Sequence, residues 1–194
     1  YGCAEQRGSR TLALVLAGDL GQAFSLPGID HARLRPVAQQ SLKELERYQC
    51  GNGGFAYWPG DCHYTSPYLT SYLLHVFKTS ADLKYQVTPD VMRAGYRYLE
   101  ERLAANPPEN EGWWPTYTAW QAFASKVLVE GGRNQDSNLN RLYGYRDRMP
   151  VFALADLHDA LLMKGETSGD RVTDLRRRLS NAILAEAGGS HVEE

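Results

Sequence analysis

The sequence predicts an all-α protein in which helical hairpin repeats form an incomplete α/α toroid, with at most a short β-hairpin near residues 53–58. Three observations predict this class. Most of the 194 residues lie in segments whose apolar side chains recur every three or four positions, the spacing of an amphipathic helix. Strand-like sequence is confined to residues 53–58. A turn rich in glycine and aromatic residues precedes a helical segment twice, with an offset of 48 residues.

The helical periodicity predicts about eight helices along the chain. They cover residues 5–17, 31–49, 66–78, 88–105, 115–129, 138–147, 150–164 and 169–187. The first helix is expected to end at Gly18 or Gly21, because glycine is a poor helix former. The fourth begins at Thr88, a favourable N-cap residue followed by Pro89. Residues 188–194 are expected to form a loop that continues elsewhere.

The internal repeat supports stacked helical hairpins. The turns at residues 52–59 and 110–115 are alike, and the helices that follow share three aligned positions. In these positions Pro67, Thr70 and Tyr72 recur as Pro115, Thr118 and Trp120. Each repeat would bury its apolar face against the next, and fewer helices are predicted than a closed ring requires. An irregular helical bundle with similar turns is the alternative.

Composition and charge exclude several classes of protein. The net charge of −2 argues against non-specific nucleic-acid binding. The longest purely aliphatic stretch is residues 12–17, whereas a membrane span needs about 20 residues. No signal peptide opens the chain, which begins with Tyr1. Residues 1–194 are therefore expected to be one domain of a larger multidomain chain, with any export signal upstream.

The three cysteines leave two interpretations open. Cys50 and Cys62 flank one loop rich in glycine and aromatic residues. Either they form a disulfide in an oxidising compartment, or all three cysteines are reduced thiols in the cytosol. A metal site built from these two cysteines and His63 lacks a fourth ligand, so neither a metal nor another cofactor is predicted.

Cys3 and Gln6 carry the chemistry that the sequence suggests. Residues three apart at the start of a helix can approach each other on one face. The sulfur of Cys3 could then be acylated by the side-chain carbonyl of Gln6 with loss of ammonia, which forms an internal thioester. A helix N-terminus stabilises the thiolate leaving group, so this acyl group would react readily with amines and hydroxyls. It must therefore be shielded from water by an apolar cover.

Three segments resemble one known family. The string Gly2-Cys3-Ala4-Glu5-Gln6 resembles the thioester signature of the α2-macroglobulin and complement family. Residues 66–72 are similar to the helix of that family with a Leu-Thr-Ala-Tyr core, and the loop at 53–59 looks closest to its bacterial macroglobulin branch. The resemblance extends from the first residues to at least residue 130.

The resemblance implies a thioester-containing α/α domain in which Cys3 and Gln6 form the bond. Tyr1, Gly2 and Glu5 are the supporting residues: Tyr1 would shield the sulfur, and Glu5 favours the helix N-terminus electrostatically. The predicted protein is an inhibitor rather than an enzyme.

The resemblance also implies the setting. The parent would be a periplasmic, broad-spectrum endopeptidase inhibitor that serves bacterial defence. A protease cuts a bait region, the thioester becomes exposed, and a lysine amine of the protease attacks the Gln6 acyl group. The partners are therefore target proteases and the other domains of the parent chain. The bait region and any membrane anchor would lie in parts of the parent outside these 194 residues.

The histidines bear on the choice of nucleophile. Some complement proteins place a histidine near the thioester carbonyl, in the region that corresponds to residues 106–118, and it redirects the acyl group to hydroxyls. This chain has no histidine between Val76 and Leu157. We therefore expect direct attack by amines, with little preference for hydroxyls.

The sequence leaves two alternative functions, an enzyme and a non-covalent docking module. Gln49-x-x-x-Gly53-Gly54-Phe55 resembles the repeat of triterpene cyclases, which share the α/α architecture, but the chain lacks the Asp-rich motif that such enzymes need. A glycosidase would need paired carboxylates, for which Glu109 and Glu111 are candidates, but two glutamates in a Pro-rich turn usually belong to a solvated loop. The other alternative is a non-covalent docking module with a vestigial thioester.

Overall fold

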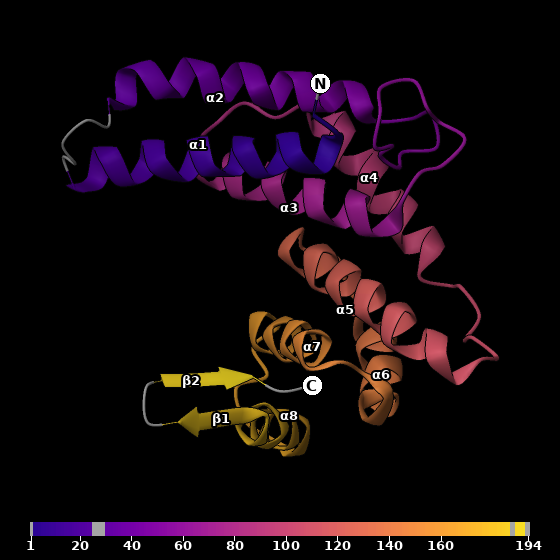
Figure 1. Cartoon of the computed structure of the whole chain (residues 1–194). Coiled ribbons are helices and arrows are strands. Elements are labelled where there is room, and N and C mark those ends of the chain that lie inside the picture. Colours follow the sequence, from indigo (N-terminus) through magenta and orange to yellow (C-terminus); the bar gives the residue numbers. More distant parts are fainter. Residues whose placement is uncertain (1, 25–29, 187–188, 193–194) are drawn as a thin grey trace. The chain divides into compact units, whose positions relative to one another are not determined.

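The computed structural model describes residues 2–24, 30–186 and 189–192, and its chain divides into two compact units, Tyr1–Arg102 and Leu103–Glu194. Helices dominate both units, and the only sheet among the described residues is one two-stranded hairpin near the C-terminus (Figure 1). The predicted all-α class with a short β-hairpin is confirmed. No helix within the described ranges combines the length and apolar character needed to cross a bilayer.

The described residues of the first unit form four α-helices. They are α1 (Ala4–Phe24), α2 (His31–Leu45), α3 (Pro67–Asp82) and α4 (Pro89–Arg102), with a 3-10 turn at Glu46–Tyr48. The α1 helix packs against both α2 and α3, and α3 packs against α4 (Figure 1). Side-chain caps fix two helix starts: Asp30 accepts from the N–H groups of Ala32 and Arg33, and Ser66 accepts from that of Leu69. A core that includes Val15, Leu42, Phe55, Leu73 and Phe77 lies between these helices.

The α1 helix is longer than predicted, because Gly18 and Gly21 do not end it. Both glycines are buried on the helix face that also carries Gly8, Thr11 and Val15. A side chain at Gly8 would approach a methyl group of Leu73 to 2.8 Å, so this face is in close contact with α3. The glycines therefore serve helix packing, and the burial they allow offsets their poor helix propensity.

In the second unit, the residues that the structure describes form four more α-helices and the hairpin. The helices are α5 (Trp114–Glu130), α6 (Asp136–Gly144), α7 (Val151–Met163) and α8 (Asp170–Asn181), with 3-10 turns at Glu111–Trp113 and Arg146–Arg148. The α5 and α8 helices both pack against α7. The core includes Ala122, Leu142, Leu157, Leu161 and Leu175.

The β-hairpin lies at a different place from the one predicted. Its strands are β1 (Ile183–Glu186) and β2 (Gly189–Val192), which pair antiparallel, so the last predicted helix ends at Asn181 and residues 189–192 are not a loop. Near residues 53–58 the chain forms only the isolated bridges Gln49–Phe55 and Ala56–Thr65. Hydrogen bonds with neighbouring segments occupy the backbone around Phe55, so residues 53–58 do not pair with each other as a hairpin.

Asp174 is the centre of a charged network on α8. Its carboxylate accepts hydrogen bonds from Arg146 at 2.9 Å, Arg178 at 3.0 Å, Arg177 at 2.7 Å and the Tyr143 hydroxyl at 3.2 Å. Burial disfavours the charged carboxylate, but the hydrogen bonds from Arg177 and Arg178 outweigh it and hold the pKa of Asp174 at about 2, below its ordinary 3.8. The network thus stabilises the fold while Asp174 is ionised.

We predict that this stabilisation depends on acidity in a defined direction. A lowered pKa in the folded state stabilises the protein fully above the ordinary pKa of 3.8 and is lost as the pH falls towards 2. Wild type and Asp174→Asn are compared by urea unfolding from about pH 5 to about pH 2. The wild type should be more stable at the upper end, and the difference should shrink on acidification. A difference that stays constant across this range would contradict the assignment.

Candidate functional site

Cys3 and Gln6 come together at the N-terminus of α1 through half of a capping box. Cys3 is the N-cap residue, because its carbonyl accepts the first helical hydrogen bond, from the Arg7 N–H at 3.0 Å. Gln6 is the third helical residue, and its Oε1 accepts a hydrogen bond from the Cys3 N–H at 3.2 Å. A side chain at this position that reaches back to the N-cap N–H is the capping-box arrangement. It folds the Gln6 carboxamide back towards the residue that carries the thiol.

The start of α1 is fixed by a second segment. The Ala4 N–H donates to the carbonyl of Tyr57 at 2.9 Å, and Ala4 itself is fully buried. This bond satisfies one of the N–H groups that a helix N-terminus leaves without an intrahelical partner. The remaining positive end of the helix dipole lies at Cys3.

The supporting residues differ in exposure. Cys3 is a free thiol of intermediate burial, Gly2 and Glu5 are also half-buried, and Gln6 is exposed. Glu5 lies in the first turn, where its negative charge interacts favourably with the positive end of the helix dipole. Burial raises the pKa of Tyr68 on α3, and the nearby Glu5 carboxylate adds to the rise. The prediction for Tyr1 falls outside the described residues.

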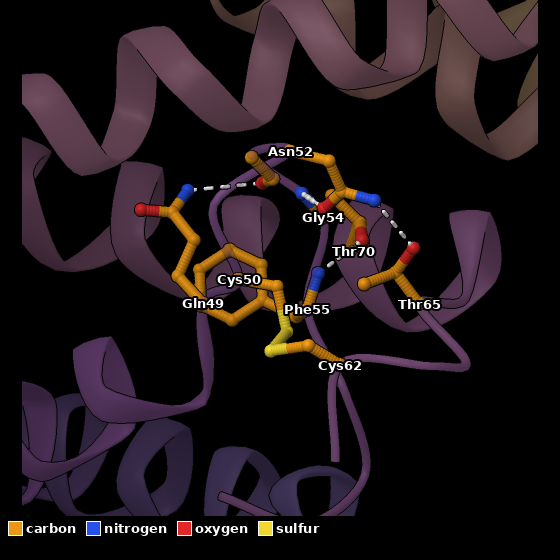
Figure 2. The surroundings of a disulfide bond; sticks show 9 residues. Gln49, Cys50, Asn52, Gly54, Phe55, Cys62, Thr65 and Thr70 are labelled. Atoms are coloured by element: carbon orange, nitrogen blue, oxygen red, sulfur yellow. Dashed lines mark hydrogen bonds between the residues drawn. A yellow bond between two sulfur atoms is a disulfide. The ribbon is translucent and has the colours of Figure 1, made fainter. Parts of the chain in front are cut away.

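The loop that supplies Tyr57 contains the disulfide Cys50–Cys62, whose Cα atoms are 5.6 Å apart (Figure 2). Of the two interpretations left open by the sequence, the structure has the disulfide. Neither sulfur is therefore available as a metal ligand. No group of three or more His, Cys, Asp or Glu residues that could hold a metal ion occurs in the part of the chain that the structure describes.

Hydrogen bonds fix the same loop from several sides (Figure 2). The Asn52 carboxamide donates to the Thr65 hydroxyl and accepts from the Gly54 N–H, and the Phe55 N–H donates to the Thr70 hydroxyl. Gln49 donates to the carbonyls of Gly53 and Val91. The Thr70 position aligned by the internal repeat thus holds the Gly-aromatic turn against α3.

A pocket of about 820 Å³ lies beside Gln6 between α1 and α2. Gly2, Gln6, Arg7 and Arg10 line it from the α1 side, and Val37 and Glu44 are among its α2 residues. Arg7 forms an ion pair with Glu44 at 3.1 Å. A second pocket of about 370 Å³ shares Gly2, Arg7 and Glu44 and adds Arg47 and Trp58.

The aromatic residues of the two Gly-aromatic turns differ in burial and position. Phe55 is fully buried in the core, Tyr57 packs against that core, and Trp58 is exposed beside Gly2 at the second pocket. Trp113 and Trp114 belong to the second unit. The Arg7–Glu44 ion pair was not predicted from the sequence. The two residues are 37 positions apart, and the amphipathic pattern around Glu44 predicts a helix without indicating which residue its carboxylate meets.

The chain is similar to bacterial alpha-2-macroglobulins in part of its sequence and in its fold. No family model matches the chain. Over 100 residues, or 52% of its length, it is 26% identical to an alpha-2-macroglobulin of Rickettsia conorii, of which it covers 5%.

Solved structures show the same fold. Native Escherichia coli alpha-2-macroglobulin matches 93% of this chain with a TM-score of 0.78 at 23% identity. Salmonella alpha-2-macroglobulin reacted with methylamine matches 96% with a TM-score of 0.75 at 22% identity. Other structures with this fold are the E. coli protein activated by porcine elastase and by trypsin. The chain spans 12% of the first two proteins. The predicted resemblance to bacterial alpha-2-macroglobulins is confirmed.

Gly53 is a strict requirement of the loop that positions α1. Its φ is +87°, and a Cβ there would overlap the carbonyl oxygen of Ala94. We expect Gly53→Ala to lower the unfolding free energy by about 2–4 kcal/mol. The control is Gly51→Ala, where a Cβ would meet no atom within 4 Å and whose change should stay within about 0.5 kcal/mol. Equal urea midpoints for the two variants would refute this assignment.

Proposed function

We propose that this chain is the thioester domain of a bacterial alpha-2-macroglobulin-like protease inhibitor, and that Cys3 and Gln6 form its internal thioester. The single observation that carries the proposal is the capping contact between the Cys3 N–H and Gln6 Oε1 at the start of α1. It arises from the same spacing that the thioester requires, on a fold shared with alpha-2-macroglobulins.

The proposed chemistry has two balanced steps. In the first, the Cys3 sulfur bonds to the Gln6 side-chain carbonyl carbon and the carbon–nitrogen bond breaks. The carboxamide nitrogen takes up the thiol proton and leaves as ammonia. In the second, an amine nitrogen bonds to that carbon and the carbon–sulfur bond breaks. The electron pair of the broken bond goes to sulfur, which takes up the proton that the amine releases. The Cys3 N–H and the helix dipole would stabilise the negative charge that develops on the carbonyl oxygen.

Target proteases are the proposed partners. The E. coli relative is activated by elastase and by trypsin, and the Salmonella relative has been reacted with methylamine. A lysine of a protease carries the same kind of primary amine as methylamine. Protease capture through a lysine is therefore consistent with a domain that presents an exposed Gln6. The domain itself would act without turnover, as a trap rather than an enzyme.

A periplasmic location is part of the proposal. The Cys50–Cys62 disulfide fits an oxidising compartment, where such bonds form and persist. The remaining cysteine, Cys3, is then the one set aside for the thioester. The other domains of the parent chain would cover it until a protease cuts the bait region.

The covalent step is tested by Cys3→Ala in the full-length parent protein. We expect covalent adducts with trypsin to fall to background on denaturing gels, while bait cleavage continues, because the acyl group cannot form without the sulfur. The matched control is Ser9→Ala, at an exposed position further along α1, which should capture like the wild type. Undiminished adducts in Cys3→Ala would contradict the thioester. Protease inhibition that is unchanged in Cys3→Ala, with no covalent adduct in either protein, would instead support the docking module with a vestigial thioester.

The choice of nucleophile is tested by competition. Because no histidine lies between Val76 and Leu157 to relay the acyl group, methylamine should label residue 6 in strong preference to glycerol. Mass spectrometry of the peptide that contains Gln6 quantifies both products. Predominant glycerol ester would contradict direct attack by amines.

A further inference from the structure

More positive than negative side chains line the pocket beside Gln6. Its charged lining residues are Arg7, Arg10 and Glu44. Glu44 is held at both oxygens, by Arg7 at 3.1 Å and by the Gln40 carboxamide at 3.2 Å. Glu44 and Arg7 therefore largely neutralise each other, and Arg10 leaves the pocket with an excess of positive charge.

Arg10 is well placed to act on whatever approaches Gln6. It lies four residues after Gln6 on α1, so the two side chains are neighbours on one helix face, and both are exposed. Arg47 adds a further cation in the adjoining pocket, which shares Arg7 and Glu44. The Nε of Arg7 is buried and has no acceptor among the residues that the structure describes. Positive charge thus exceeds negative charge in the pocket beside the proposed acyl group.

We propose that this pocket selects amines by the charge they carry, and that Arg10 is the residue that determines the selection. The favoured substrates are primary amines held next to a carboxylate, such as a lysine on an acidic patch of the captured protease. Amines held next to a second cation are disfavoured. The inference rests on the proposed function, because it names the substrate class of the same site.

The physical basis is the potential in the pocket. The amine attacks as a free base, so its own nitrogen brings no net charge in that form. A group attached to it does bring charge, and a carboxylate gains from Arg10 in the transition state whereas an ammonium loses. At a partly exposed site one unpaired charge changes a rate by about threefold, and salt reduces the effect.

The experiment compares three amines on the full-length parent protein, whose ammonia deficit by mass is checked first. The amines are β-alanine, which carries a carboxylate, n-propylamine, which carries no further charge, and 1,3-diaminopropane, which carries a second ammonium. Rates of thiol release at residue 3 are measured for wild type and Arg10→Gln. Each amine is compared with itself between proteins, which removes its intrinsic reactivity.

Arg10→Gln should slow β-alanine about threefold, speed diaminopropane about threefold and leave propylamine unchanged, and high salt should make wild type resemble the variant. Glu44→Gln should have the opposite effect, with β-alanine favoured further. The control is Arg97→Gln, an exposed arginine on α4 outside the pocket lining, which should leave all three rates as they are. If Glu44→Gln fails to fold because the ion pair with Arg7 is lost, the rates measured with Arg10→Gln alone decide whether the pocket selects amines by charge.

Two negative results are distinguishable. In one, the parent protein has the mass expected for a thioester, but Arg10→Gln changes the three rates equally or not at all. This result overturns the charge selection and leaves the proposed thioester unaffected. A wild type with no ammonia deficit and no reaction with any of the amines overturns the proposed function, and the selection with it.

Discussion

The hydrogen bond from the Cys3 N–H to the Gln6 carboxamide is the contact on which the account of this domain depends. It requires that the helix begin at Ala4 and at no neighbouring residue, since a shift of one position would remove Gln6 from the third helical place. The carbonyl of Tyr57 fixes that starting point from another segment. The reactive pair is therefore defined by a loop about fifty residues away as much as by its own sequence.

That loop is held by covalent and non-covalent means together. The disulfide closes it, Gln49 ties it to α4, and Thr70 ties it to α3. A loop closed by a disulfide of this span loses about 3 kcal/mol of conformational freedom in the unfolded chain. A rigid loop keeps the carbonyl of Tyr57 in place, where it accepts the hydrogen bond that fixes the start of α1.

Much of the fold could be predicted because it depends on local signals. All eight helices follow from periodicity and caps such as Ser66 and Thr88-Pro89. Gly18 and Gly21 misled the prediction, since their value lies in burial on a helix face, which depends on tertiary packing. The disulfide remained undecided because the spacing of Cys50 and Cys62 in the sequence does not set their distance in space.

The candidate site was predictable only in part for the same reason. Cys3 and Gln6 are close in sequence, so their approach follows from helical geometry. Glu44 comes from α2 and meets Arg7 only once the helices have packed, so the charged pocket could not be foreseen. Local chemistry was thus accessible from the sequence, whereas the surroundings that would tune it were not.

The central claim is tested most directly by weighing the peptide that holds residues 3 and 6, taken from the undisturbed parent protein after rapid alkylation. We expect this peptide to weigh one ammonia less than its sequence requires and to carry no alkyl group on Cys3. After treatment with methylamine, it should carry a methylamide at residue 6 and a free thiol at Cys3. An alkylated Cys3 beside an intact Gln6 in untreated protein would contradict the central claim.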